Sequence, residues 1–129
     1  MCRLLNLTAI AAMAAALATT VPAAAESSNG NAAYLLIEVE VNDPTAFNNY
    51  AEKATEMVQR YGGTFVVMGG KVRSVEGAPP AGNVVVIRFQ EYEMAERWLD
   101  SEEYARIKTI RHNSAQTRQI LVEAIGEDQ

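Results

Sequence analysis

The chain has 129 residues and a formal net charge of −5 at pH 7, which is the size of a single domain. Its Lys and Arg residues form no cluster, and proteins that bind nucleic acid depend on clustered cations, so we expect no nucleic-acid partner. One cysteine, Cys2, and one histidine, His112, do not supply the ligands of a typical zinc site. We therefore expect neither a metal nor a cofactor.

The first 25 residues have the pattern of a secretory signal peptide. A positive charge at Arg3 precedes an apolar region, which ends in the small-x-small cleavage pattern of Ala23–Ala25. This region is short and rich in alanine for a membrane anchor, which takes about 20 strongly apolar residues. We expect cleavage near Ala25 and a periplasmic or secreted protein that has left the membrane. Residues 26–33 predict a flexible linker, and 127–129 predict a tail.

The segment 34–61 predicts a strand followed by a helix. Residues 34–41 are rich in β-branched and aromatic side chains, which is typical of a strand. Asp43 can cap a helix whose first position is Pro44. Apolar residues then recur at spacings of three and four, until Gly62-Gly63 ends the helix.

Two glycine pairs flank the next predicted strand, 64–68. A phosphate-binding loop needs its glycines between a strand and a following helix, whereas Gly62-Gly63 lies after a helix and Gly69-Gly70 within a strand region. We interpret both pairs as structural. A bulge at Gly69-Gly70 should let the strand continue through residues 71–75.

The second half repeats the pattern of the first. After a loop at 76–82, residues 83–89 predict a strand and 91–100 a short helix. Ser101 can cap another helix, and residues 117–125 predict the last strand.

The element order is therefore β-α-β-β-α-β, the ferredoxin-like arrangement of an α+β domain. It predicts an antiparallel four-stranded sheet with its helices on one face. The opposite face would carry Tyr34, Leu36, Val84 and Val86 beside charged residues, and it is too apolar to stay in water. We expect a second copy to cover it and to leave a cleft between the two sheets.

Three charged residues on this opposite face are candidates for catalysis. The first and third strands are neighbours in this topology, so Glu38 or Glu40 could contact Arg88. Carboxylates beside a cation in a partly dry cleft can act as a general acid or base. The alternative interpretation is a structural ion pair across strands or across the dimer.

Tyr34, Tyr104 and Arg111 are candidates for ligand binding. Tyr104 and Arg111 are two turns apart on one helix, and an arginine can bind an anionic group through two hydrogen bonds. Alternatively, Arg111 forms an ion pair with a carboxylate of the sheet or of the partner copy, such as Glu103 or Glu123. His112 is expected at the surface near the helix end, and the large aromatic residues are expected to fill the core.

Several short motifs together point to a family, and they span residues 34–126. They are the start Val39–Pro44, Tyr50, Gly62–Phe65, Gly69-Gly70, Glu76-Gly77, Ser101–Tyr104, Arg111 and Leu121–Glu123. In these features the chain resembles the domain of unknown function DUF1330, of the dimeric α+β barrel superfamily. The resemblance implies a homodimer with facing sheets and implies no established reaction. Arg88 stands where family members often have a carboxylate.

Three functions remain open from the sequence. The first is an exported homodimer that binds a small organic ligand between its sheets. The second is a cofactor-independent oxygenase or isomerase acting on a small organic acid or aromatic molecule in that cleft. The third is a protein-interaction module that docks through its helical face. A cavity with convergent polar groups would favour the first two.

Overall fold

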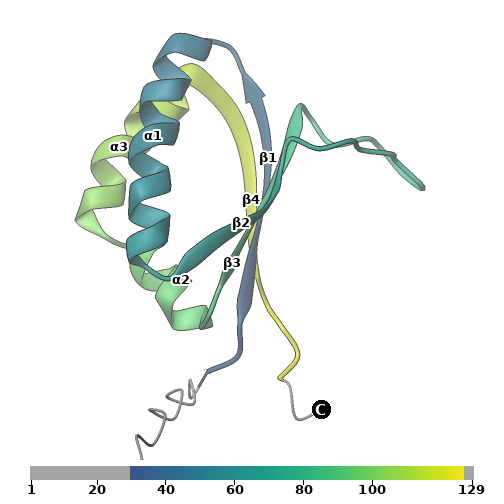
Figure 1. The fold of residues 1–129 in the computed structure, drawn as a ribbon. Coiled ribbons are helices and arrows are strands. Elements are labelled where there is room, and N and C mark those ends of the chain that lie inside the picture. Colours follow the sequence, from purple (N-terminus) through teal and green to yellow (C-terminus); the bar gives the residue numbers. More distant parts are fainter. Residues whose placement is uncertain (1–29, 127–129) are drawn as a thin grey trace, which may run out of the picture.

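The computed structural model describes residues 30–126 and confirms the ferredoxin-like α+β fold (Figure 1). The predicted signal peptide, most of the linker and the tail lie outside these residues. The elements are β1 (Ala33–Val41), α1 (Pro44–Arg60), β2 (Gly63–Met68), β3 (Asn83–Phe89), α2 (Tyr92–Leu99), α3 (Glu102–Ser114) and β4 (Ala115–Glu123). Between residues 30 and 126, no helix is both long enough and apolar enough to cross a membrane.

The four strands form one antiparallel sheet in the order β2-β3-β1-β4. The three helices cover one face of this sheet, and its other face, called the open face below, carries no helix (Figure 1). Side chains alternate between the faces along each strand. In β1, Leu35 and Val39 are therefore buried under the helices, while Leu36 and Glu40 are exposed on the open face.

The starts of α1 and α3 follow the local signals in the sequence. The side chain of Asp43 accepts a hydrogen bond from the backbone N–H of Ala46 at 3.1 Å, and Pro44 is the first residue of α1. The hydroxyl of Ser101 accepts one from the N–H of Tyr104 at 3.1 Å at the start of α3. These bonds satisfy N–H groups that have no partner within the helix.

The second strand is shorter than predicted, because residues 71–75 form no strand. Gly69 takes a left-handed conformation with φ 62°, donates its N–H to the carbonyl oxygen of Val84 at 2.9 Å, and turns the chain away from the sheet. Residues 69–82 then form an extended arm that projects on the side away from the helices (Figure 1). The register shift lies between Phe65 and Val67, so the prediction of a bulge at Gly69-Gly70 was wrong.

The last strand begins and ends two residues earlier than predicted. The carbonyl oxygen of Ser114 accepts the N–H groups of Asn42 and Asp43, so the chain pairs with β1 as soon as α3 ends. At the other end, Glu123 pairs with Ala33, the first residue of β1. Beyond this residue the N–H of Ala124 still donates to the carbonyl oxygen of Ala32 at 2.7 Å, outside both strands.

The hydrophobic core lies between the sheet and the helices. Leu35, Ile87 and Phe89 from the sheet pack against Val58 of α1 and Trp98 of α2, and all five side chains are almost completely buried. The ring of Trp98 lies 4.6 Å from that of Tyr104, centroid to centroid. The core therefore joins all three helices to one face of the sheet and forms the walls of the cavity described next.

Candidate functional site

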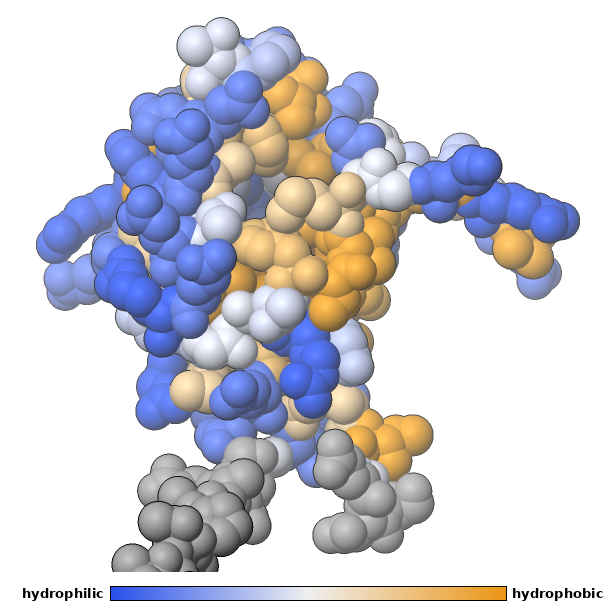
Figure 2. All heavy atoms as spheres, in the orientation of Figure 1, coloured by the Kyte–Doolittle hydropathy of each residue, from blue (hydrophilic) through white to orange (hydrophobic). Residues whose placement is uncertain are grey.

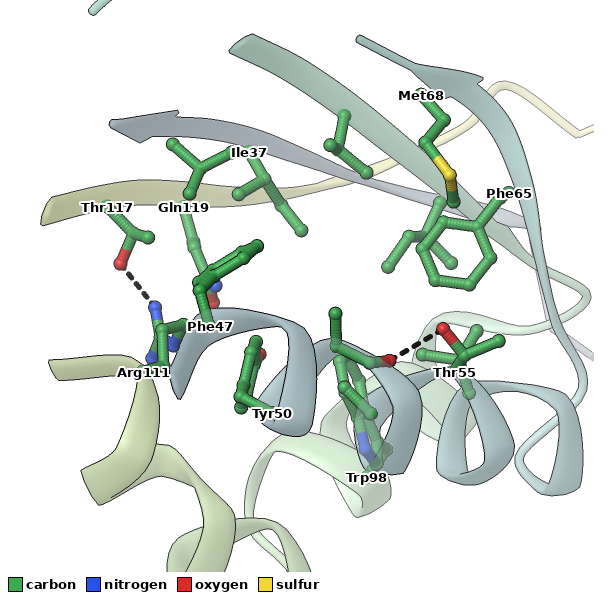
Figure 3. A pocket seen from close by; sticks show the side chains of 16 residues that line it. Ile37, Phe47, Tyr50, Thr55, Phe65, Met68, Trp98, Arg111, Thr117 and Gln119 are labelled. Atoms are coloured by element: carbon green, nitrogen blue, oxygen red, sulfur yellow. Dashed lines mark hydrogen bonds between the residues drawn. The ribbon is translucent and has the colours of Figure 1, made fainter. Parts of the chain in front are cut away.

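A cavity of about 150 Å³ lies between α1 and the helix-covered face of the sheet (Figure 3). All four strands contribute side chains to its walls, and α2 and α3 add one residue each. In the space-filling view, apolar side chains surround a hollow between the polar helical layer and the sheet (Figure 2). The cavity is smaller than the pockets of about 300–1,000 Å³ that hold drug-sized ligands, so only a small molecule fits it.

One end of the cavity is apolar. Phe65 and Met68 of β2 lie together at this end, and Trp98 lies below the cavity (Figure 3). Thr55 also lines the cavity, but its hydroxyl donates to the carbonyl oxygen of Ala51 at 2.7 Å. A hydroxyl that is already bonded within the helix contributes little polarity, so these walls suit a hydrocarbon group.

The opposite end is polar and is formed by Arg111 of α3 with Thr117 and Gln119 of β4 (Figure 3). The guanidinium of Arg111 donates a hydrogen bond to the hydroxyl oxygen of Thr117. The side-chain amide of Gln119 makes no hydrogen bond with any residue between 30 and 126. The three side chains converge because β4 follows α3 without a loop.

Arg111 is buried, with only 4% of its surface exposed. Its guanidinium carbon lies 5.8 Å from the ring centroid of Tyr50 and 6.0 Å from that of Tyr104. These distances are typical of cation–π contacts, which partly replace lost hydration. They do not replace an anion, and no carboxylate in the described chain lies within ion-pair distance of Arg111.

The expected ion pair of Arg111 with Glu103 or Glu123 is therefore absent within the described chain, and a pair with a carboxylate of a partner copy stays a prediction. Glu103 forms an ion pair with Arg60 of α1 at 2.5 Å. Glu123 accepts a hydrogen bond from the side chain of Asn31 at 3.0 Å. Both carboxylates lie in exposed positions, whereas the guanidinium of Arg111 points inward, so neither can reach it.

Three buried polar side-chain atoms have no hydrogen-bond partner among residues 30–126, and two of them belong to residues that line the cavity. They are Nε of Arg111, the hydroxyl of Tyr104 and Nε1 of Trp98. Buried polar groups are nearly always paired in native proteins. The unpaired Nε of Arg111 is the one that belongs to a charged group, and Arg111 lines the cavity.

Tyr50 and His112 flank Arg111 and both favour their neutral forms. Burial and the nearby Tyr104 raise the pKa of Tyr50 well above the ordinary value for a tyrosine, although Arg111 acts in the opposite direction. Desolvation, Arg111 and Lys108 lower the pKa of His112, whose Nε2 lies 3.4 Å from a guanidinium nitrogen of Arg111. Arg111 is thus the one cationic side chain in the cavity wall.

The catalytic candidates Glu38, Glu40 and Arg88 all lie on the open face, away from this cavity. Glu38 forms its ion pair with Arg118 of β4 at 3.3 Å. Arg88 pairs in register with Tyr34, and Glu38 with Val84. Arg88 and Glu38 are thus four strand positions apart, or about 13 Å at 3.3 Å per residue. The structure does not bring these candidates together.

The ligand-binding candidates are divided between the two faces. Tyr104 and Arg111 lie near each other under the helices, whereas Tyr34 is half-buried on the open face. Tyr50, Thr117 and Gln119 were missed as site residues. The spacing of Tyr50 in α1 placed it in the core, and the alternation of β4 could have placed Thr117 and Gln119 on the same face as Leu121.

The described part of the chain contains no group of three or more His, Cys, Asp or Glu side chains that could hold a metal ion. The polar groups at the cavity are instead a guanidinium, an amide and hydroxyls. Such groups bind an anion or a carbonyl oxygen through hydrogen bonds.

The model of a known family, the domain of unknown function DUF1330, matches residues 32–125. The chain belongs to the DUF1330 family. The resemblance noted in the sequence is thereby confirmed. No curated protein matches this DUF1330 chain.

Solved structures share the fold of this DUF1330 domain at low sequence identity. The RPA0582 protein of unknown function from Rhodopseudomonas palustris has a TM-score of 0.61 at 15% identity, covering 74% of this chain and 84% of that one. A hypothetical Arabidopsis thaliana protein has a TM-score of 0.55 at 13% identity, and the match covers 79% of this chain and 95% of that one. SnoaB, a cofactor-independent oxygenase from Streptomyces nogalater, has a TM-score of 0.52 at 15% identity, and the match covers 75% of this chain and 96% of that one. At these identities the likeness shows the fold alone.

Proposed function

We propose that this DUF1330 protein binds a small organic molecule in the cavity between α1 and the sheet. The observation that carries the proposal is an apolar cavity with polar side chains converging at one end. Its volume of about 150 Å³ is comparable to that of an engineered apolar cavity that binds benzene. The ligand is therefore of the size of one six-membered ring with a small substituent.

Binding has more support than catalysis. The second candidate, a cofactor-independent oxygenase or isomerase, draws on the fold that the chain shares with SnoaB, and fold kinship alone does not carry a reaction. A general base must lie within hydrogen-bond reach of the substrate. The cavity wall contains no carboxylate and no histidine, and the raised pKa of Tyr50 keeps its hydroxyl protonated.

The open face supports a homodimer as the working form. One row of aliphatic side chains crosses all four strands, because Val67 pairs with Val86, Val86 with Leu36, and Leu36 with Ile120. Val67, Leu36 and Ile120 are all exposed. A continuous apolar surface of this kind is typical of an interface, and a twofold axis would cover it with the same row of a second copy. A cleft between two such sheets stays a prediction.

The helical face gives less support to the third candidate, docking to a different protein. The outer surface of the helices is mainly hydrophilic in the orientation of Figure 2. Recognition surfaces usually contain a buried apolar centre. The open face offers one, and the helical face in this view does not.

Export is part of the proposal and depends on the sequence of residues 1–25. An amino-terminal sequence beginning near Glu26, in a periplasmic or culture fraction, would support it. A full-length chain retained in the cytoplasm of its own host would contradict it. This measurement is independent of the ligand.

Ligand binding can be followed through Trp98, the only tryptophan of the chain, which lines the cavity and is 1% exposed. Benzene, toluene and cyclohexanol should change its fluorescence and raise the melting temperature, because each fits the apolar end. Ligand at 100 times Kd stabilises a protein by about 2.7 kcal/mol.

Ala51→Leu provides the test of location, because Ala51 lines the cavity and the added carbon atoms occupy its volume. Ala105→Leu, at an exposed position on α3, is the matched control and should bind like the wild type. Unchanged binding by Ala51→Leu would place the ligand elsewhere. The absence of binding by all three neutral probes and by small organic acids would overturn the proposed function.

A further inference from the structure

Arg111 is a buried cation without a counter-charge. Only 4% of its surface is exposed, and within the described chain its guanidinium makes polar contacts only with neutral groups, the hydroxyl of Thr117 and, at 3.4 Å, Nε2 of His112. Its Nε has no partner among the described residues. An uncompensated buried charge is strongly unfavourable, so a domain that keeps one gains from an anion that enters beside it.

We propose that the polar end of the cavity binds the carboxylate of a small organic monoacid. The apolar part of the acid would extend toward Phe65 and Met68 at the other end (Figure 3). The inference rests on the proposed function and specifies the chemical class of its ligand.

The charge around Arg111 fits a monoanion. The wall of the cavity contains one cationic side chain and no acidic one. His112 lies beside the guanidinium, but its lowered pKa keeps it neutral at pH 7. A dianion such as a phosphate monoester would bring one more negative charge than this wall neutralises, and burying the excess charge would be costly.

The hydrogen-bond donors also fit a carboxylate. An arginine presents its N–H groups in a planar fork that matches the two oxygens of a carboxylate. Thr117 accepts from one terminal guanidinium nitrogen and His112 lies 3.4 Å from the other, whereas Nε has no partner among the described residues. The Gln119 side chain lines the same end of the cavity without a partner among residues 30–126, and its amide can donate a further bond. A neutral ligand of the same shape would leave the guanidinium uncompensated.

The test compares ligand pairs that differ only in charge, with binding followed by Trp98 fluorescence and by calorimetry. The pairs are benzoate with benzamide and cyclohexanecarboxylate with its amide, each at pH 7 with the full mature chain. We expect each acid to bind at least tenfold more tightly than its amide. Sodium phosphate and sodium chloride form separate arms, and we expect neither to compete with benzoate at millimolar concentration.

Arg111→Gln should remove the preference for the acid, so that acid and amide bind within about twofold of each other. Arg106→Gln is the matched control, because Arg106 lies on the same helix with an exposed side chain, and it should keep the preference. If Arg111 had only a structural role, Arg111→Gln would change the stability of the protein, but the wild type would bind acids and amides equally well. The wild-type comparison therefore tests the proposal even if Arg111→Gln does not fold.

The outcomes separate the inference from the proposed function. Equal binding of acids and amides by the wild type would overturn the carboxylate site and leave a ligand-binding cavity in place. Competition by chloride or phosphate at millimolar concentration would also overturn it, because the site would then take any inorganic anion. Failure of acids, amides and neutral probes alike would overturn the proposed function itself.

Discussion

A Cβ atom added to Gly82 would lie 2.1 Å from the carbonyl oxygen of Val39. Gly82 closes the arm at the start of β3, and its backbone has a φ of 71°, which side chains other than that of glycine rarely adopt. The close approach to β1 and the left-handed conformation both require glycine at this position. The path of the chain from the arm into β3 therefore depends on a glycine at position 82.

We expect Gly82→Ala to lower the free energy of unfolding by about 2 kcal/mol or more, because strain and a backbone clash coincide. Gly70→Ala is the matched control in the same arm. A Cβ there meets no atom within 4 Å and its φ is not positive, so its effect should stay within about 0.5 kcal/mol. Urea denaturation measures both. Equal effects of the two substitutions would contradict the assigned role of Gly82.

Leu36→Glu should convert the proposed homodimer into monomers at micromolar concentration. Leu36 lies in the middle of the aliphatic row on the open face, and two buried carboxylates facing each other would repel. Thr109→Glu, on the exposed side of α3, is the control and should not change the association. Sedimentation velocity distinguishes the two states. A wild-type chain that sediments as a monomer would contradict the homodimer directly.

The Arg60–Glu103 ion pair joins α1 to α3. It should contribute to the loss of folding stability as the pH is lowered into the acid range. A hydrogen bond from Arg60 lowers the pKa of Glu103 below its ordinary value of 4.5. The folded state then binds fewer protons than the unfolded chain. The stabilisation that the ion pair provides is therefore present above pH 4.5 and is lost as the pH falls through the pKa of Glu103 in the folded state.

Glu103→Gln should therefore weaken the loss of stability between about pH 4.5 and lower values, relative to the wild type. The pair is exposed, so the effect should be small and should shrink in 1 M salt. Thermal melts at a series of pH values measure it. Parallel acid limbs for the two proteins at low salt would show that the pair contributes nothing.

Tyr50 should make the domain sensitive to alkali. Its folded pKa is raised from the ordinary value of 10.0, so the folded state keeps a proton that the unfolded chain releases. The contribution of the protonated Tyr50 to the free energy of unfolding is complete below pH 10. Above pH 10 it declines by about 1.4 kcal/mol per pH unit. Tyr50→Phe should have a flatter alkaline limb in urea denaturation. An identical slope in the two proteins would contradict the burial of a protonated hydroxyl.

The sequence predicted the starts of α1 and α3 well because their causes are local. Asp43 and Ser101 accept hydrogen bonds from backbone N–H groups three residues later, so a short window of sequence contains the whole interaction. The extension of β2 through residues 71–75 was wrong for the opposite reason. Strand propensity reports a fit to a pleated surface, but whether a neighbouring strand is within reach depends on the turn at Gly69.

The partners in ion pairs were also difficult to predict from the sequence. The predicted face of Glu38 was right, yet its partner is Arg118 and not Arg88, because strand register decides which side chains meet. A carboxylate partner for Arg111 was also expected, and none lies within ion-pair distance in the described chain. Charge pairing was inferred from the presence of nearby acidic residues, whereas burial separates Arg111 from all of them.

The cavity itself lay beyond the reach of sequence patterns. Periodicity placed Tyr50 in the core, but a void depends on how side chains from α1 and four strands fit together in three dimensions. Small residues at Ala51 and Ala54 leave space opposite Ile37 and Val85, and no single segment of sequence contains this relationship. The missed site residues all belong to this contact between distant segments.

The arm of residues 69–82 gives a protease a place to cut without destroying the domain. Lys71 and Arg73 are exposed in it, outside any helix or strand, and trypsin cleaves after such residues when the chain is extended and accessible. The β2 and β3 strands on either side remain paired along the sheet. Brief digestion should thus yield two fragments that separate in denaturant but elute together in native buffer, a split form that could be reassembled from separately expressed halves.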